Sequence, residues 1–346
     1  MRDWQASEVS SPSSESFRES QTESELEQLR AALKALRSSL DTAIFGYREE
    51  VDLLIQSLLA GGHVLLEGAP GLGKTTLVRS LAESLELKFQ RIQFTPDLMP
   101  ADILGSRILE EDPATGRRSF GFERGPIFAH VVLADEINRA TPRTQSALLE
   151  AMQESQLTLH GTTHSLEEPF LVIATENPIE MEGTYPLPEA QLDRFLCKIE
   201  LNAPEEAQLI KILEATTGPR PPALEPCLDR ETLLRIRALT LEVPTSSEIL
   251  ALVARVVGAT DPTSKFAPES VRRYVRFGSS PRGGQSILLL SKARALASGR
   301  VFVSEDDVRA LAAPALRHRL VLGYEAEAAG VRPDDLVRDA LESAQG

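Results

Sequence analysis

The chain has 346 residues, of which 42% are hydrophobic and 25% charged, and this indicates a globular protein of about two domains rather than a collagen-like, mucin-like or wholly disordered chain. Acidic residues outnumber basic residues 51 to 37, giving a formal charge of −14, and aromatic residues make up only 5%. Such a surface repels nucleic acid and anionic membranes unless a local basic stripe exists, so both are disfavoured as partners.

The N-terminal residues 1–23 are rich in Ser, Glu and Gln and poor in apolar side chains, which predicts a disordered acidic tail. Ser24 and Glu27 then form a capping-box pattern, which predicts the start of a helix. Leucines follow at helical spacing, at Leu26, Leu29, Leu33, Leu36 and Leu40. This stripe predicts a helix that packs on its own domain, and docking to a partner is the alternative that the spacing leaves open.

Residues 24–204 alternate between helical and strand patterns. Helices are predicted over 49–59 and 75–85. Short apolar or alternating runs predict strands over 63–67, 89–94, 131–134, 170–175 and 196–201. This alternation predicts an α/β domain, in which a parallel five-stranded sheet carries helices on both faces.

Residues 68–75 read GAPGLGKT and match the phosphate-binding pattern G-x-x-x-x-G-K-[ST] at every fixed position, between a predicted strand and a predicted helix. Glycines let backbone N–H groups turn toward phosphate oxygens, and the helix N-terminus adds positive potential. We expect Lys74 to contact the β- and γ-phosphates of ATP and Thr75 to ligate Mg²⁺. The expected nucleotide contacts are Gly68, Ala69, Pro70, Gly71, Leu72, Gly73, Lys74, Thr75 and Thr76.

The apolar run that starts at Val131 ends in two acids, Asp135 and Glu136. A carboxylate at the C-terminal end of a neighbouring strand can reach Mg²⁺ beside the phosphate-binding loop, so we assign Asp135 to the metal. Glu136 is then placed to act on the attacking water as a general base. The strand over 170–175 leads to Asn177, which could hold this water or touch the γ-phosphate, and a turn-forming Asn-Pro pair is the alternative.

Beyond Pro204 the pattern becomes helical, with joints rich in Pro and Gly. Helices are predicted over 205–216, 230–241, 247–257, 268–277, 285–298 and 304–312. Residues 205–346 therefore predict a small all-helical domain.

Further strings accompany the phosphate-binding loop: ADEINRA at 134–140, QSALLEAMQE at 145–154, ATENP at 174–178, EGTYPLPEAQLDRF at 182–195 and GSSPRGGQ at 278–285. Together they resemble the AAA+ superfamily, and within it the MoxR family, over about residues 40–320. The resemblance implies an AAA+ P-loop domain over 24–204, a helical lid over 205–346, and a hexameric ring that holds ATP and Mg²⁺ between subunits.

The resemblance also implies roles for three side chains. Asn177 matches the sensor-1 position, and Arg194 matches an arginine finger that reaches the γ-phosphate of the neighbouring subunit. Arg282 matches the sensor-2 arginine, which reports loss of the γ-phosphate as movement of the lid. The alternatives are a surface pair between Arg194 and Asp193 or Glu189, and an ordinary arginine at a helix start for Arg282.

Two inserts fit the same family. Residues 101–125, with a predicted turn at 112–116, resemble the helix-2 insert, and residues 156–168, with Gly161 at the tip, resemble the hairpin before sensor 1. Both would face one side of the ring, where a client protein could be remodelled, and plain surface hairpins are the alternative.

The segment from Ile44 to Tyr47 departs from the family. It lies where such proteins commonly carry a Val-Gly-Gln string near adenine, so Phe45 and Gly46 are expected beside the base, and Tyr47 replaces the glutamine.

The resemblance suggests a chaperone-like ATPase that matures or activates other proteins, typically ones with von Willebrand factor A domains. A ring-shaped nucleic-acid motor stays open as an alternative, although the charge and the lack of a Lys/Arg-rich run oppose it. A nucleotide-gated binding module with little turnover also stays open, although intact Glu136, Asn177 and Arg194 oppose that reading.

The two cysteines, Cys197 and Cys227, cannot build a disulfide framework or a four-thiolate zinc site, and we expect one buried thiol and one at the surface or in a loop. The sequence contains no secretory signal and no apolar stretch of about 18 residues, so we expect a cytoplasmic protein without direct membrane insertion.

Overall fold

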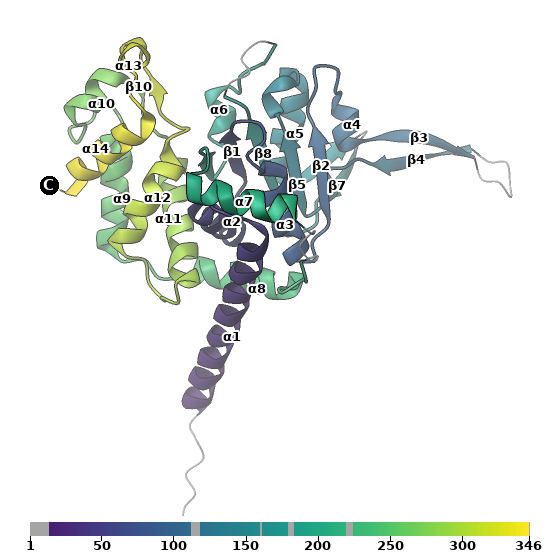
Figure 1. The fold of residues 1–346 in the computed structure, drawn as a ribbon, viewed down its shortest axis with the longest axis horizontal. Helices are drawn as coiled ribbons and strands as arrows, with labels where there is room; N and C mark the ends of the chain where they lie inside the picture. The colour runs from purple at the N-terminus through teal and green to yellow at the C-terminus, as the bar shows by residue number, and fades with distance from the viewer. Residues whose placement is uncertain (1–13, 112–117, 160, 179–182, 219–223, 346) are drawn as a thin grey trace, which may run out of the picture.

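The computed structural model describes residues 14–111, 118–159, 161–178, 183–218 and 224–345. A five-stranded sheet forms the centre of its N-terminal part (Figure 1), and all neighbouring strands are parallel. In sheet order the strands are β2 (Phe89–Gln93), β5 (Val131–Asp135), β8 (Leu171–Glu176), β1 (Val64–Gly68) and β9 (Cys197–Leu201). The predicted parallel sheet is confirmed. One expectation is corrected, because β8 separates the strand that carries Asp135 from the strand that leads into the phosphate-binding loop.

Both faces of the sheet are buried, which explains why its strands read as continuous apolar runs. Val131 and Leu133 of β5 belong to one buried cluster, and Val132 and Ala134 belong to the other. Helices α2 (Arg48–Ala60) and α3 (Lys74–Ser84) contribute to the first cluster, and α4 (Pro100–Leu104) and α5 (Pro142–Glu154) contribute to the second. Helices therefore cover both faces, as predicted.

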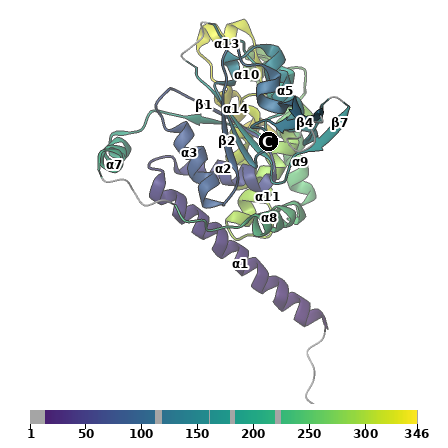
Figure 2. The ribbon, with the colours of Figure 1, turned by 90° about the vertical axis from the view of Figure 1, so that its right-hand side faces the viewer.

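Helix α1 (Ser14–Ala43) begins ten residues before Ser24 and extends away from the domain (Figures 1 and 2). The predicted disordered tail is therefore wrong over 14–23, because Glu, Gln and Arg favour helix even where few apolar residues are present; residues 1–13 lie outside the described part. The last half of α1 packs on its own domain, so the leucines of this half are not exposed for docking to a partner protein. Its buried leucines are Leu29, Leu33, Leu36 and Leu40.

The C-terminal part is helical, as predicted. Its helices are α7 (Glu206–Thr217), α8 (Arg230–Glu242), α9 (Ser247–Ala259), α10 (Glu269–Tyr274), α11 (Pro281–Ala297), α12 (Glu305–Leu316), α13 (Tyr324–Ala329) and α14 (Pro333–Gln345). The predicted helix over 268–277 ends early, because its last residues form β10 (Val275–Phe277), which pairs with β11 (Val321–Leu322). The prediction of an all-helical domain therefore missed this small antiparallel sheet.

The C-terminal helices pack firmly on the α/β domain, because one buried cluster runs from α2 into α9, α11 and α12. Helix α7 differs, since none of its residues is buried, and Figure 2 shows it standing apart from the rest of the domain.

Both predicted inserts are antiparallel hairpins. Strands β3 (Gly105–Glu111) and β4 (Arg118–Arg124) form an arm that projects from the body (Figure 1), and the predicted turn at 112–116 lies outside the described residues. Strands β6 (Gln156–Leu159) and β7 (Thr162–Ser165) form the second hairpin, with Gly161 at a φ of 81° between them.

The cysteines lie as expected, with Cys197 buried and Cys227 half-buried. Burial raises the pKa of the Cys197 thiol to about 11. No helix in the described part of the chain is long and apolar enough to cross a membrane.

Candidate functional site

The loop between β1 and α3 has the backbone of a phosphate-binding loop. Gly71 and Gly73 adopt φ angles of 83° and 82°, in the left-handed region that favours glycine. A Cβ on Gly68 would lie 3.0 Å from the Cβ of Leu201, so a larger side chain at this strand end would force Leu201 to shift. The N–H groups of Gly71, Leu72 and Gly73 donate to no other backbone group in the described part of the chain. These groups are therefore available to an anion at the start of α3.

Lys74, the first residue of α3, is buried and joins two strands of the sheet. Its Nζ donates to the carbonyl of Gly68 at 2.6 Å, at the end of β1, and to the carbonyl of Glu176 at 3.3 Å, at the end of β8. Thr75 is half-buried and Thr76 is exposed. The lysine is thus held at the carboxyl edge of the sheet, where parallel α/β folds bind their ligands.

Asp135 and Glu136 lie at the same edge, at the end of β5. Oδ1 of Asp135 accepts a hydrogen bond from the Thr175 hydroxyl at 2.7 Å, and Oδ2 accepts from Nε and Nη2 of Arg91 at 2.9 and 2.6 Å. The N–H of Glu136 donates to the same Thr175 hydroxyl at 2.8 Å. One threonine therefore fixes the positions of both acids across the β5–β8 pair.

The Glu136 carboxylate is held through one oxygen. Oε2 accepts from Nε2 of Gln93 at 2.8 Å and from Nη1 of Arg139 at 3.1 Å. Glu136 also has a φ of 58°, an uncommon backbone angle for a residue other than glycine, and such strain is often found at functional sites.

Thr175, Arg91 and Gln93 were not identified from the sequence. Arg91 and Gln93 lie on β2, and they meet the two acids because β2 pairs with β5 in the register Gln93↔Asp135. A polar residue in a short strand carries no signal of that pairing, so only the register could have revealed these contacts.

Asn177 is buried directly after β8, at the same edge as the acids. The residue before it, Glu176, has its pKa raised by burial. The structure therefore brings together four of the residues that the sequence predicted for phosphate and metal chemistry, namely Lys74, Asp135, Glu136 and Asn177.

The segment expected near adenine lies between α1 and α2. Phe45 is half-buried, and Gly46 has a φ of 91° and accepts a hydrogen bond on its carbonyl from Nε2 of Gln208 at 2.9 Å. Tyr47 is buried in the core, and its hydroxyl donates to the carbonyl of Asn202 at 3.3 Å. Tyr47 therefore packs in the core, and Gln208 ties α7 to this segment.

Arg194 and Arg282 lie at the opposite edge of the sheet. The phosphate-binding loop follows β1, whereas residues 193–196 precede β9, and these two strands are parallel neighbours. Five residues of strand at about 3.3 Å each separate the two edges by about 16 Å. Arg282, at the start of α11, forms an ion pair with Asp193 at 3.6 Å. Arg282 therefore lies at the edge of the sheet opposite the phosphate-binding loop of its own chain.

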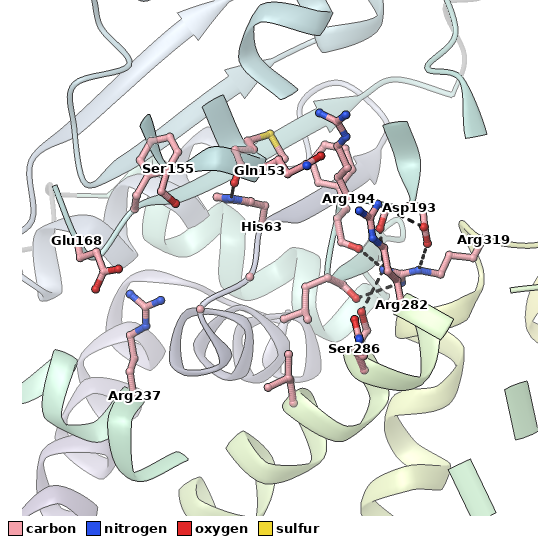
Figure 3. Close-up of a pocket in the computed structure, with 18 residues that line it drawn as sticks. His63, Gln153, Ser155, Glu168, Asp193, Arg194, Arg237, Arg282, Ser286 and Arg319 are labelled. Carbon is pink, nitrogen blue, oxygen red and sulfur yellow. Dashed lines mark hydrogen bonds and ion pairs between the residues drawn. The ribbon is translucent and has the colours of Figure 1, made fainter. Parts of the chain in front are cut away.

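The two arginines share a pocket of about 360 Å³ (Figure 3). Arg194 donates from Nη1 to the carbonyl of Leu149 at 2.7 Å, so the predicted alternative, a surface pair with Asp193 or Glu189, does not form among the described residues. Figure 3 shows Asp193 between Arg282 and Arg319, with Arg194 alongside. The lining includes four arginines and two carboxylates: Arg194, Arg237, Arg282, Arg319, Asp193 and Glu168. This balance favours an anionic ligand.

His63 also lines this pocket, at the start of β1. Its Nδ1 accepts from the N–H of Val172 at 3.0 Å, so its Nε2 carries the proton and donates to the carbonyl of Met152 at 3.0 Å. Burial lowers the pKa of His63 to about 4. A neutral imidazole therefore joins β1, β8 and α5.

The carboxyl-edge residues fit ATP and Mg²⁺. Free N–H groups at a helix start and a buried lysine suit the phosphates. Magnesium keeps several waters and takes a few carboxylate, hydroxyl and phosphate oxygens, which matches a site built from Thr75 and Asp135. In the described part of the chain, no cluster of three or more His, Cys, Asp or Glu side chains could hold a metal ion. Magnesium at Thr75 and Asp135 would therefore also need oxygens from phosphate and water.

The sheet order, the phosphate-binding loop and the paired helical domain define an AAA+ ATPase fold. Residues 63–197 match the ATPase family associated with various cellular activities (AAA), and residues 268–340 match the AAA lid domain. The chain belongs to the MoxR family of AAA+ ATPases, as the sequence indicated.

Individual relatives agree with this assignment. Chaperone MoxR1 of Mycobacterium tuberculosis is 42% identical over 87% of this chain and 78% of its own length. The protein YeaC of Bacillus subtilis is 39% identical over 92% of this chain and 95% of its own. The crystal structure of a proposed ATPase from Cytophaga hutchinsonii superposes with a TM-score of 0.88 at 35% identity, covering 94% of this chain and 98% of that one.

Proposed function

We propose that this protein hydrolyses ATP with Mg²⁺, at a site shared between neighbouring subunits of a ring, and uses the energy to remodel or activate partner proteins. One observation carries the proposal. Phosphate- and metal-binding residues gather at one edge of the sheet, whereas the two arginines expected at the γ-phosphate lie at the opposite edge. A subunit whose arginines cannot reach its own phosphates needs a neighbour to complete the site.

In this proposal, the N–H groups of the phosphate-binding loop and Lys74 bind the β- and γ-phosphates, while Thr75 and Asp135 hold Mg²⁺. The metal supplies Lewis-acid stabilisation of charge on the phosphates. Both carboxylate oxygens of Asp135 already accept hydrogen bonds, so it would act through a bridging water or after releasing Arg91.

Glu136 serves as the base that accepts a proton from the attacking water. Gln93 and Arg139 both bind its Oε2, which fixes the plane of the carboxylate and leaves Oε1 for the water. Asn177, buried beside this position, orients the same water or the γ-phosphate.

Arg194 and Arg282 act on the nucleotide of the neighbouring subunit. Leu149 is the only hydrogen-bond partner of the Arg194 side chain among the described residues, so its guanidinium keeps donors for a phosphate oxygen. A cation supplied across the interface neutralises transition-state charge and couples hydrolysis to contact between subunits.

The catalytic part of the proposal is tested with Glu136→Gln. We expect this variant to bind ATP and to lose turnover by about 100-fold or more, as for removal of a general base. The matched control is Glu150→Gln, which changes an exposed carboxylate on α5 and should leave turnover unchanged. Near-normal hydrolysis by Glu136→Gln would remove Glu136 as the base.

The shared site is tested by co-expressing Lys74→Ala and Arg194→Ala subunits. Each homogeneous ring should be inactive. Mixed rings should regain activity. At some of their interfaces, the intact Lys74 of one subunit faces the intact Arg194 of its neighbour. Lack of recovery in mixed rings, with assembly confirmed by light scattering, would contradict the shared site.

For the partner, the chaperone name of the mycobacterial relative and the two hairpins, one of which projects as an arm, support a client protein. We expect a von Willebrand factor A domain protein encoded beside this gene to bind the Glu136→Gln ring in ATP. Strong, salt-sensitive stimulation of ATPase activity by DNA would instead favour the nucleic-acid motor.

A further inference from the structure

An ion pair that the sequence motifs did not reveal joins the helical lid to the loop that carries Arg194. Arg319 follows α12 and is buried, and its Nε donates to Oδ1 of Asp193 at 2.9 Å. The rest of its guanidinium binds the backbone of the same loop, since Nη2 donates to the carbonyls of Phe195 at 2.6 Å and Asp193 at 3.2 Å. One side chain from the lid thus fixes the loop that carries Arg194.

Asp193 also holds the other arginine. Its carboxylate accepts from the hydroxyl of Ser280, which lies 3.0 Å from each oxygen, and Ser280 caps α11 by accepting from the N–H of Arg282 at 3.2 Å. The same carboxylate forms the ion pair with the Arg282 guanidinium. Asp193 therefore connects Arg282 to the loop that carries Arg194, because Arg194 follows Asp193 directly in the chain.

We propose that Asp193 and Arg319 form a positioning pair, which holds Arg194 and Arg282 as one rigid unit for the phosphates of the neighbouring subunit. The proposal rests on the shared site described above and adds two residues to it. Neither residue of the pair touches the nucleotide. Arg319 is almost completely buried and its donors are used within the chain, whereas the side chain of Arg282 is 48% exposed and Arg194 keeps free donors.

Charge explains why a carboxylate is needed at this position. The guanidinium groups of Arg282 and Arg319 meet at Asp193, and Arg194 lines the same partly buried pocket, so without the negative charge of Asp193 the arginines would repel one another. Asparagine has nearly the same shape but offers no charge and only one acceptor oxygen. The Asp193→Asn variant therefore loosens the arginines while leaving the phosphate-binding loop, at the other edge of the sheet, intact.

The first measurement separates positioning from binding. In Asp193→Asn we expect kcat to fall about 100-fold, as for misplacement of a reacting group by about 1 Å. The affinity for a fluorescent ATP analogue should stay unchanged, because the residues that bind it belong to the other edge. A near-normal kcat, or a parallel loss of ATP affinity, would overturn the proposal.

The matched control is Glu200→Gln. Glu200 also joins the sheet to the lid, through Arg317 at 3.7 Å and Arg332 at 3.2 Å, but it lies at the other end of β9. We expect normal kcat in this variant. An equal loss of kcat in Glu200→Gln would mean that any contact between the sheet and the lid affects turnover, which would contradict a specific role for Asp193.

The second measurement assigns the defect to one side of the interface. Asp193→Asn subunits co-expressed with Lys74→Ala subunits should regain activity, whereas co-expression with Arg194→Ala subunits should not. If Arg194→Ala complements Lys74→Ala but Asp193→Asn does not, the positioning pair is refuted while the shared site stands. If Arg194→Ala also fails to complement Lys74→Ala, both the shared site and the positioning pair are refuted.

A second variant covers the case in which Asp193→Asn does not fold. Ser280→Ala removes the hydroxyl between Asp193 and the backbone of Arg282 and leaves the buried Asp193–Arg319 pair in place. We expect kcat to fall about tenfold at unchanged ATP affinity. Unchanged kcat in Ser280→Ala would contradict the connection between the two arginines.

Discussion

The buried histidine at the start of β1 predicts how stability depends on pH. Both ring nitrogens of His63 are used, one accepting from the N–H of Val172 and the other donating to the carbonyl of Met152. A second proton would break the first bond and place a charge in a buried site near Arg237. Burial accordingly lowers the pKa from 6.5 to about 4.

The size of the effect follows from these two pKa values. Between pH 6.5 and 4 the unfolded chain binds a proton at this position and the folded chain does not, so stability falls as the pH falls. The free energy of unfolding should be about 1.3 kcal/mol lower at pH 5.5 than at pH 7.5, and the full loss below pH 4 approaches about 3 kcal/mol.

The assay is urea unfolding followed by circular dichroism at pH 7.5 and 5.5, both above the sequence pI of about 5.0. His63→Gln keeps an acceptor and a donor but cannot be protonated, so its loss of stability between the two pH values should be smaller by about 1 kcal/mol. His164→Gln, on the peripheral strand β7, is the control and should behave like the parent chain. An equal pH dependence in the parent and in His63→Gln would refute the reasoning.

Three substitutions test other parts of the structure. Leu36→Ala removes a fully buried side chain of α1 and should lower the free energy of unfolding by about 2–5 kcal/mol in urea; no change would contradict the docking of α1. Thr175→Val removes the hydroxyl shared by Asp135 and Glu136, so ATPase turnover should fall about tenfold or more, whereas Thr175→Ser should keep most of it. Gly46→Ala forces a Cβ onto a residue with a φ of 91° and should destabilise the fold by about 1–2 kcal/mol, measured by thermal denaturation; an unchanged midpoint would contradict this.

Local chemistry explains what could be predicted from the sequence. The phosphate-binding loop needs glycines, a lysine and a threonine at fixed spacing within eight residues, and these are visible without any tertiary information. The strand ending at Asp135 and Glu136 is similar, because an apolar run followed by acids is a local pattern. The strands buried on both faces were predicted for the same reason, and their observed bounds differ from the predicted ones by at most one residue at either end.

Contacts between distant segments could not be predicted in this way. Thr175 lies 40 residues from Asp135 in the chain, and Arg319 lies 126 residues from Asp193. A threonine in an apolar strand or an arginine after a helix has no distinctive pattern of its own. Their roles arise from sheet register and from the packing of the lid on the α/β domain.

The sequence by itself therefore determined the family, the parallel sheet and the residues proposed to bind phosphate and metal, because each depends on short-range spacing. Only the tertiary structure decided that β8 lies between β5 and β1, and that Arg282 pairs with Asp193 at the edge of the sheet opposite the phosphate-binding loop of its own chain. The physical reason is that the edge of the sheet on which a side chain lies depends on strand order and lid docking. Both are set by burial of apolar surface between segments far apart in the chain.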